Sequence, residues 1–455
     1  VPPPPSSLAR ESRVRAASVV FMALAPIFLI ISACSLLLLP VVTTTVVDYT
    51  VSTVVLAPTT TVSVTSCPGV VADGRTECAA PLEACIETCL QSSSCGEIVF
   101  PSGDYLLERS VSLNVSSGPH TTKPLLIRGE GKSSRLLWPT DDDLLVWSGG
   151  AAELTISSLV FRSTGAKSPS STALRFLGPS VTGSLFDALR IEADTPGHNV
   201  GGGLDLSPLT DSCTVRETQI WGCTGTGIKV GSGSQVIIKG GRVIGNGPTP
   251  RGTSIGVHLT GNNGGVHLAQ IDLIAHLEAV RLDNSSGAGS NREIFIAQAT
   301  LDSSWRGLAV YDNSYVDIAG CWAASSEDSN IFVSPDSGGA LLSINGGTIF
   351  NACAEQPNAT TGAGCNGLQV HAGSFALTGV TVRNNRGTGI YAGPKVAEYS
   401  ITGNIVRENG IGADLSGDVL SVTGNVFARN RVAWRLAEGL KEVAVFGNVG
   451  LPAAA

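Results

Sequence analysis

Carboxylate and tryptophan side chains gather in one central stretch of this 455-residue chain. Hydrolysis of a glycosidic bond requires two carboxyl groups roughly 5–9.5 Å apart, one acting as the acid and the other as the base or nucleophile. The candidates for these catalytic roles are Glu278, Asp302 and Asp272. Tryptophan presents a flat apolar face to a sugar, and arginine and histidine donate hydrogen bonds. The candidates for substrate binding are therefore His276, Arg306, Trp322, Trp305 and Arg281.

A purely structural role is the alternative for the same residues. Glu278 has two possible ion-pair partners nearby in the repeat, Arg281 and Arg306. Charged residues on the outer side of a strand are mostly solvated and do nothing specific. The choice between these interpretations depends on the elements that position the side chains.

These residues belong to a short strand pattern that recurs along the chain at steps of 21 to 37 residues. Its members begin at Leu174, Leu204, Ile228, Val257, Val280, Leu308, Ile331, Leu368, Ile390, Ala413 and Trp434. Repeats of this length are typical of solenoids, arrays and propellers. The shortest steps set the period, and the longer ones indicate loops inserted into it.

Two further apolar strands accompany the first strand in each repeat, for example 236–238 and 243–244, with a glycine-rich corner between them. Three short β-branched strands per repeat predict an all-β fold, a parallel β-helix. We expect the coil to be right-handed. Successive residues of a strand face opposite sides, so the middle residue of each first-strand triplet is expected to face outward. The same alignment predicts an outward column of Asp272, Thr300 and Trp322.

The N-terminal part of the chain has a different composition. Residues 1–15 form a short basic, proline-rich tail, and residues 16–42 carry no charge and are long enough to cross a bilayer as a single transmembrane helix. The arginines before this segment favour a cytoplasmic N-terminus and an extracellular C-terminal domain. A cleaved signal peptide is the alternative, and it would make the protein secreted. Residues 43–68 are a Thr/Val/Pro tract, either a glycosylated stalk or an extra β-segment. The β-helix is expected over residues 69–450, and a tail over 451–455.

Three sequence motifs between residues 73 and 105 resemble the entry segment of the pectin-lyase-like superfamily. They are Asp-Gly-Arg-Thr at 73–76, Pro-Leu-Glu-Ala-Cys-Ile-Glu at 81–87 and Gly-Glu-Ile-Val-Phe-Pro-Ser-Gly-Asp-Tyr at 96–105. The resemblance implies a parallel β-helix whose first coil is closed by a capping helix, here at about 79–91. An apolar face formed by Leu82, Cys85, Ile86 and Cys89 supports such a helix independently.

The resemblance implies a function connected with polysaccharide but leaves its nature open. The superfamily contains polysaccharide lyases, polygalacturonases, epimerases, phage tailspikes and non-catalytic adhesins, and a shared fold does not fix the activity. Where polygalacturonases carry their catalytic aspartates, this chain has Glu278, Arg306 and Ser329. The pectate lyase and alginate epimerase motifs are also absent. Two hypotheses follow: a membrane-anchored glycoside hydrolase or polysaccharide lyase, and a non-catalytic adhesin or glycan-binding rod.

Cysteine clusters and glycosylation motifs favour an oxidising, extracellular compartment. We expect bridges Cys213–Cys223 and Cys353–Cys365 around two loops. Two more are expected among the five cap cysteines, with one of the five left over; the candidates are Cys78, Cys85, Cys89 and Cys95, and the fifth is Cys67. Cys321 is expected to be a small core residue. The acceptor pattern for N-glycosylation occurs at Asn114, Asn284 and Asn358.

Charge and composition limit the cofactors and partners. The net charge of −8 and a pI near 5.3 argue against nucleic acid as a partner. The Asp141-Asp142-Asp143 run offers oxygen ligands that Ca²⁺ prefers, but a solvated turn is the favoured interpretation, and no metal or other cofactor is predicted. The expected partners are a polysaccharide and, through residues 16–42, a membrane.

Overall fold

The computed structural model describes residues 60–114, 124–149, 151–178, 180–247, 253–284, 289–354, 364–438 and 442–450. The chain divides into two units, Val1–Val55 and Leu56–Ala455, and every described residue belongs to the second. The predicted basic tail, membrane segment and C-terminal tail, most of the Thr/Val/Pro tract, and Asn358 lie outside the described residues. Within the described ranges, no helix is both long and apolar enough to cross a membrane.

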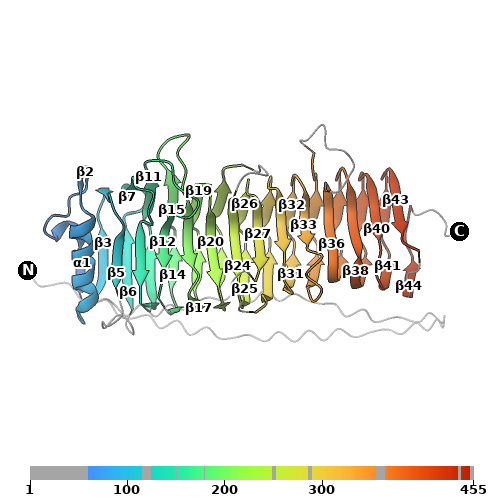
Figure 1. The fold of residues 1–455 in the computed structure, drawn as a ribbon, viewed down its shortest axis with the longest axis horizontal. Coiled ribbons are helices and arrows are strands. Elements are labelled where there is room, and N and C mark those ends of the chain that lie inside the picture. Colours follow the sequence, from blue (N-terminus) through green and yellow to red (C-terminus); the bar gives the residue numbers. More distant parts are fainter. Residues whose placement is uncertain are drawn as a thin grey trace, which may run out of the picture. The chain divides into compact units, whose positions relative to one another are not determined.

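Short parallel strands stack along the second unit (Figure 1). Three series of strand pairings form its three walls. Within the 30-stranded sheet, one series of parallel pairings forms the first wall. Its strands are β5 (Val111–Asn114), β8 (Leu145–Ser148), β12 (Thr172–Phe176), β16 (Gly202–Leu206), β20 (Thr226–Gly231), β24 (Ile255–Thr260), β27 (Glu278–Asp283), β30 (Arg306–Val310), β33 (Ser329–Val333), the first part of β36 (Asn366–Thr378), the first part of β38 (Thr388–Thr402), β40 (Ile411–Leu415) and β43 (Val432–Leu436).

A second series in the same sheet forms the second wall, and β36 and β38 run continuously from the first wall into it. Its strands are β1 (Thr60–Ser63), β3 (Cys95–Phe100), β6 (Leu125–Gly129), β10 (Leu154–Ser157), β14 (Leu185–Asp187), β18 (Thr214–Arg216), β22 (Ile237–Lys239), β25 (Gly264–Ala269), β28 (Arg292–Ala297), β31 (Tyr315–Ala319), β34 (Leu341–Asn345), β41 (Val419–Thr423) and β44 (Glu442–Phe446). Four short strands lie at the corner between these walls: β9 (Ala151–Ala152), β13 (Ser180–Thr182), β17 (Leu209–Asp211) and β21 (Gly233–Ser234).

The 14-stranded sheet is the third wall. Its strands are β2 (Asp73–Glu77), β4 (Gly103–Leu106), β7 (Ser134–Trp138), β11 (Val160–Ser163), β15 (Arg190–Ala193), β19 (Gln219–Cys223), β23 (Arg242–Gly245), β26 (Asp272–Ile274), β29 (Thr300–Asp302), β32 (Trp322–Ala324), β35 (Thr348–Phe350), β37 (Thr381–Arg383), β39 (Ile405–Arg407) and β42 (Val426–Ala428). Two short 3₁₀ turns, η1 (Val64–Ser66) and η3 (Gly131–Ser133), complete the described elements.

The register of the first wall confirms the predicted repeat at every step. The paired residues are Leu174 with Leu204, Leu204 with Ile228, Ile228 with Val257, Val257 with Val280, Val280 with Leu308, Leu308 with Ile331, Ile331 with Leu368, Leu368 with Ile390, Ile390 with Ala413 and Ala413 with Trp434. Because these apolar residues face inward, they stack into one continuous buried core, and the residues between them face outward.

The corners of the C-terminal coils are held by ladders of buried asparagine. Asn385 Nδ2 donates to Asn409 Oδ1 at 2.9 Å, and Asn409 Nδ2 donates to Asn430 Oδ1 at 3.0 Å. The same Oδ1 atoms also accept backbone N–H groups of the previous coil. These contacts satisfy polar groups that the turns would otherwise bury without partners. They hold successive coils in register.

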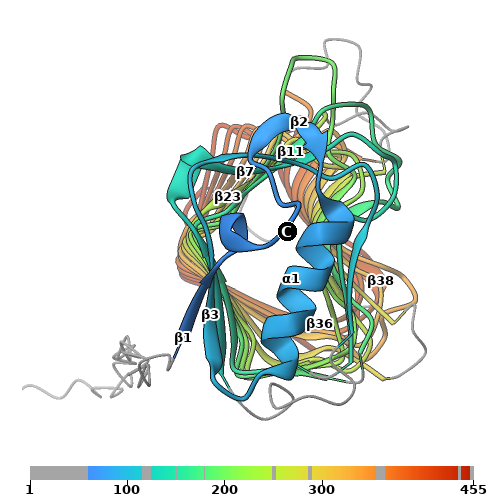
Figure 2. The same cartoon turned by 90° about the vertical axis from the view of Figure 1, so that its left-hand side faces the viewer.

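The helix expected at about 79–91 is present as α1 (Ala79–Gln91), with Leu82, Cys85, Ile86 and Cys89 buried. Figure 2 shows α1 lying across the end of the stack that carries β1 and β3. Disulfides Cys67–Cys85 and Cys89–Cys95 tie α1 to the segments on either side of it. The five cysteines of this segment therefore form two bridges, but Cys67 takes the place that we expected for Cys78, whose thiol is free and buried.

Other sequence expectations need correction. The Cys353–Cys365 bridge is present. The predicted Cys213–Cys223 bridge is wrong, because both thiols are free and point into the core at different corners, donating to Val181 O at 3.3 Å and Gly201 O at 3.1 Å. Cys321 is a free, buried core residue, as expected.

The first strand lies earlier in the chain than the predicted boundary at residue 69. β1 (Thr60–Ser63) pairs in parallel with β3 and belongs to the second wall. Of the two alternatives for residues 43–68, the described end of the tract is therefore a β-segment. Its other residues lie outside the described ranges.

Candidate functional site

The structure divides the eight predicted site residues between two walls and the corner that joins them. Those on the first wall are Glu278 and Arg281 on β27 and Arg306 on β30. Those on the third wall are Asp272 on β26, Asp302 on β29 and Trp322 on β32. His276 and Trp305 lie in the corner. We call the outward side of β24, β27, β30, β33, β36 and β38 on the first wall the central face, and the outward side of β23, β26, β29 and β32 the Trp322 face.

On the central face, Glu278 is the centre of a buried polar network and is only 3% exposed. The Tyr311 hydroxyl donates to Glu278 Oε1, and Arg281 Nη1 donates to Oε2 at 3.3 Å. Arg281 also reaches a second carboxylate, donating from Nε to Asp283 Oδ2 at 2.5 Å. One guanidinium group thus contacts two carboxylates. His258 Nε2 lies 3.1 Å from Asp283 Oδ1, which makes an ion pair if the imidazole is protonated.

Arg306 extends this network to the next coils. Its Nη1 donates to the Tyr311 hydroxyl at 2.7 Å, and its Nε donates to Asp328 Oδ2 at 2.7 Å. The guanidinium carbon also lies 3.6 Å from the centre of the Phe332 ring, a cation–π contact. Three carboxylates, two guanidinium groups and one phenol are therefore joined by direct contacts.

The protonation states in this network follow from burial and neighbouring charge. Burial, together with the negative charge of Glu278, raises the pKa of Tyr311 to about 12, so its hydroxyl remains a donor at neutral pH. Burial alone would lower the pKa of Arg306, but Tyr311 and Asp328 outweigh it, and the pKa is raised. The pKa of Arg281 is raised in the same way: Asp283 and Glu278 outweigh burial. Both arginines therefore stay charged.

Planar side chains follow one another along the same face. The ring centres of Tyr311 and Phe332 are 5.9 Å apart, those of Phe332 and His371 5.6 Å, and those of His371 and Tyr391 5.3 Å. These residues come from successive coils, which repeat about every 4.8 Å. Burial, and then the charge of Arg306, lower the pKa of His371, so its ring is neutral at pH 7. The result is an ordered aromatic column beside a buried ion network.

The Trp322 face carries a looser arrangement. The predicted outward column is confirmed, since Asp272 pairs in register with Thr300 and Thr300 with Trp322. Asp272 is held by Arg242 at 2.7 Å. Trp322 is 45% exposed and meets Phe350 edge to face, with ring centres 4.5 Å apart. Among the described residues, no ion pair joins this face to the central face.

The prediction that His276 binds substrate is wrong. The residue is 0% exposed, and its Nε2 lies 3.1 Å from Val243 O in the core. Burial lowers the pKa of His276 to about 4, so it is neutral in the folded protein. Trp305 is half-buried in the next corner, where its backbone N–H donates to His276 O at 2.9 Å. The corner thus serves packing and separates the two faces.

Seven residues of this network and aromatic column were not among the predicted site residues: His258, Asp283, Tyr311, Asp328, Phe332, His371 and Tyr391. Two of them continue strands that the repeat had already placed. Asp283 lies two residues beyond the outward Arg281, and Tyr311 two beyond Ala309, so the period of two puts them on the same side. The sequence therefore held a signal for these two residues. Asp328 belongs to a corner, whose geometry the strand period does not determine.

No metal site is found in the described ranges, where no group of three His, Cys, Asp or Glu side chains has a suitable arrangement. The aspartates of the 141–143 run instead bind their own chain. Asp141 accepts hydrogen bonds from the Ser168 backbone and from Ser171 Oγ, the latter at 3.0 Å, and Asp143 Oδ1 accepts one from Thr172 N at 2.8 Å.

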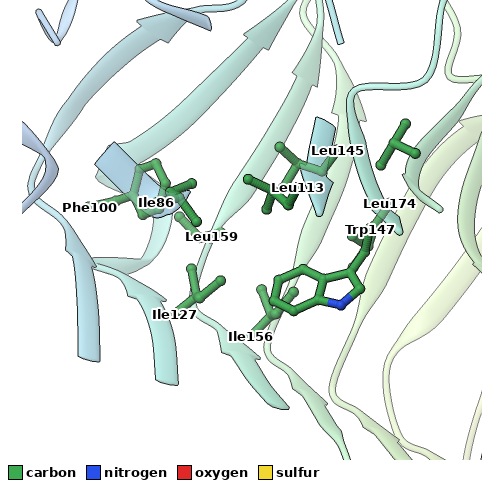
Figure 3. A pocket seen from close by; sticks show the side chains of 10 residues that line it. Ile86, Phe100, Leu113, Ile127, Leu145, Trp147, Ile156, Leu159 and Leu174 are labelled. Atoms are coloured by element: carbon green, nitrogen blue, oxygen red, sulfur yellow. The ribbon is translucent and has the colours of Figure 1, made fainter. Parts of the chain in front are cut away.

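The interior next to α1 contains a cavity of about 10 Å³ (Figure 3). Figure 3 shows its lining as apolar side chains, including Ile86 from α1, Phe100 and Trp147. Such a space holds one water molecule at most. We therefore assign it to core packing, and the central face remains the candidate site.

The fold is similar to that of several solved structures. The A-module of mannuronan C-5 epimerase AlgE6 from Azotobacter vinelandii superposes with a TM-score of 0.57 at 11% identity, covering 86% of this chain and 100% of that one. A variant of the catalytic domain of a GH87 α-1,3-glucanase, in complex with nigerose, gives 0.51 at 12% identity, with 86% and 69% covered. The Dettilon tailspike protein gives 0.50 at 15% identity, with 85% and 70% covered.

This chain has the parallel β-helix fold of the pectin-lyase-like proteins. No family model and no curated protein matches its sequence. At these identities the likeness establishes the fold, while the function has to be argued from the site.

Proposed function

We propose that this protein binds extracellular polysaccharide on the central face. The observation that carries the proposal is the column Tyr311–Phe332–His371–Tyr391 beside the network of Glu278 and the two arginines. The column extends over successive coils, so it offers a chain-like ligand several contacts in a row. The named functions of the similar structures, an epimerase and a glucanase among them, support polysaccharide as the ligand class.

Sugar chemistry suits this arrangement. A sugar ring has an apolar C–H side, which packs on aromatic rings, and hydroxyl groups, which both donate and accept hydrogen bonds. The central face presents both kinds of partner side by side. Its ion pairs fix the polar groups before a ligand arrives, which reduces the entropy lost on binding.

Cleavage of the bound chain is the second candidate function. Arg281 contacts both Glu278 and Asp283, so their carboxyl groups lie within the upper limit of about 9.5 Å found in glycosidases. This pair replaces the predicted partnership of Glu278 with Asp302 or Asp272, which lie on another wall. Binding without cleavage is favoured, because each of these two carboxylates is already engaged by a guanidinium group.

Other parts of the proposal concern the setting of the domain. We propose that residues 16–42 anchor the protein in a membrane, or direct its secretion if they are cleaved, and that the coil is right-handed. We also propose that α1 caps the solenoid, because it places apolar residues over the first coils. The exposed side chains of Asn114 and Asn284 remain predicted glycosylation sites.

A binding panel tests the proposal. The full chain in detergent is titrated with soluble polysaccharides, together with Tyr391→Ala and the matched control Trp322→Ala. We expect Tyr391→Ala to weaken binding about tenfold, as loss of a central aromatic contact does, and Trp322→Ala to leave it unchanged. Loss of binding in Trp322→Ala alone would move the site to the third wall. Release of new reducing ends, abolished by Glu278→Gln, would establish cleavage.

A further inference from the structure

We infer that the central face selects a neutral polysaccharide and discriminates against polyanionic ones. The inference rests on the proposed function and names its ligand class. It follows from the balance of charge in the buried network. Three carboxylates, of Glu278, Asp283 and Asp328, face two guanidinium groups, of Arg281 and Arg306. One negative charge is therefore in excess while His258 is neutral.

The two arginines also have little capacity left for an anionic ligand. Recognition of a uronate or sulfate group usually requires a guanidinium edge that can donate two parallel hydrogen bonds. Arg281 uses Nε on Asp283 and Nη1 on Glu278. Arg306 uses Nε on Asp328 and Nη1 on the Tyr311 hydroxyl. An anionic ligand would have to compete with an internal carboxylate for each of these donors.

The coils next to the network repeat this pattern. Arg175 contacts two carboxylates, Asp143 at 2.9 Å and Asp205 at 3.5 Å. Lys229 lies in register between Asp205 and His258, so a carboxylate also flanks this cation. Towards the other end of the wall, Arg435 lies 3.9 Å from Asp414. Over its described residues, the first wall therefore offers no run of uncompensated cations along which a polyanion could lie.

A neutral sugar meets none of these obstacles. Its hydroxyl groups carry no charge, so binding does not require an arginine to give up an internal carboxylate. The aromatic column supplies the apolar contact. A polyanion would in addition be repelled by the excess charge of the network and by the net charge of −8 on the chain.

The test compares two ligand classes at two salt concentrations. The full chain is titrated calorimetrically with neutral glucans and mannan and with polygalacturonate and alginate, at low and high NaCl. We expect neutral chains to bind with an affinity that salt hardly changes, and polyanions to bind about tenfold more weakly or not at all. Tighter binding of a polyanion, weakened by salt, would overturn the inference and leave the proposed function standing. If neither ligand class binds, both the inference and the proposed function are overturned.

A charge-neutralising variant sharpens the test. Asp328→Asn removes the excess negative charge and weakens the contact that holds Nε of Arg306, because an amide oxygen is a weaker acceptor than a carboxylate. We expect it to bind polygalacturonate about tenfold more tightly than the wild type does. Asp272→Asn, on the Trp322 face, is the matched control and should show no gain. An unchanged polyanion affinity in a folded Asp328→Asn variant would contradict the inference, and the salt dependence of the wild type tests it without any substitution.

Discussion

The central face and the Trp322 face are both outer surfaces of the same coils, yet their charged side chains differ in burial and in the number of partners that they contact. On the central face, the side chains of Arg306 and Asp328 are 20% and 14% exposed, and they belong to a network that continues to Glu278. On the Trp322 face, Arg242 and Asp272 form a single pair with side chains 43% and 33% exposed. Similar residue types therefore produce a preorganised site on one wall and a solvated surface on the other.

Burial accounts for this difference. A solvated ion pair contributes little to stability, since water competes for both partners. A buried pair is fixed in place, and removal of one partner leaves a charge that water cannot reach. We therefore assign the function to the central face, where the polar groups hold one another in place through direct contacts.

Removal of one arginine from each face should give the largest contrast. Arg306→Gln leaves Asp328 without its partner, and we expect it to lower the free energy of unfolding by about 3–5 kcal/mol. Arg242→Gln should cost about 0–1 kcal/mol, because its pair is solvated. Urea denaturation of the two variants measures both values. Equal losses would show that the two faces do not differ as described.

The corner between the faces should respond to acid. His276 has a pKa of about 4 in the folded protein, below the value of about 6.5 expected on unfolding. The contribution of neutral His276 to the free energy of unfolding is therefore fully present above pH 6.5 and is lost as the pH falls towards 4. This loss amounts to about 3 kcal/mol. The wild type should lose more stability than His276→Gln over this interval. Parallel pH profiles of the two proteins would contradict the assignment of His276 to the core.

At alkaline pH, the titration of Tyr311 on the central face should affect stability. Its pKa is raised to about 12, so between pH 10 and 12 the unfolded chain loses this proton while the folded one keeps it. The free energy of unfolding must then fall as the pH rises, by something on the order of 1 kcal/mol given its partial exposure. Tyr311→Phe should lack this part of the decrease. The comparison of both proteins by alkaline denaturation separates Tyr311 from the other tyrosines.

The smallest effect is expected on the Trp322 face itself. Trp322→Ala removes a half-exposed ring whose described aromatic contact is Phe350. We expect a loss of about 1 kcal/mol or less in thermal or chemical denaturation. A loss several times larger would mean that this face, too, is a fixed part of the structure.

The sequence alone was sufficient to predict the features that repeat along the chain. The period of two and the spacing of apolar residues placed Leu174 through Trp434 in the correct register, because a slip of one residue would turn every buried side chain outward. The helix at 79–91 was expected from the resemblance of residues 73–105 to the pectin-lyase-like entry segment, and four apolar positions on one face supported it.

The sequence alone was not sufficient to predict the geometry of the corners between strands. Asp272 and Glu278 are six residues apart, but the turn at 275–277 sends them to different walls. The same applies to Cys213 and Cys223, whose spacing resembles that of a disulfide loop while their thiols face the core at separate corners. Strand periodicity cannot determine such turns, because each depends on the packing of the coils above and below. Asp328, which lies in a corner, was missed for this reason, whereas Tyr311 and Asp283 follow from the strand period.

Hydroxyl-radical footprinting of the full chain, with and without a saturating neutral polysaccharide, tests the central claim most directly. The account predicts that ligand reduces oxidation of His371 and Tyr391 on the central face, while oxidation of the exposed Trp322 is unchanged. Protection of Trp322 with unchanged oxidation of His371 and Tyr391 would contradict it.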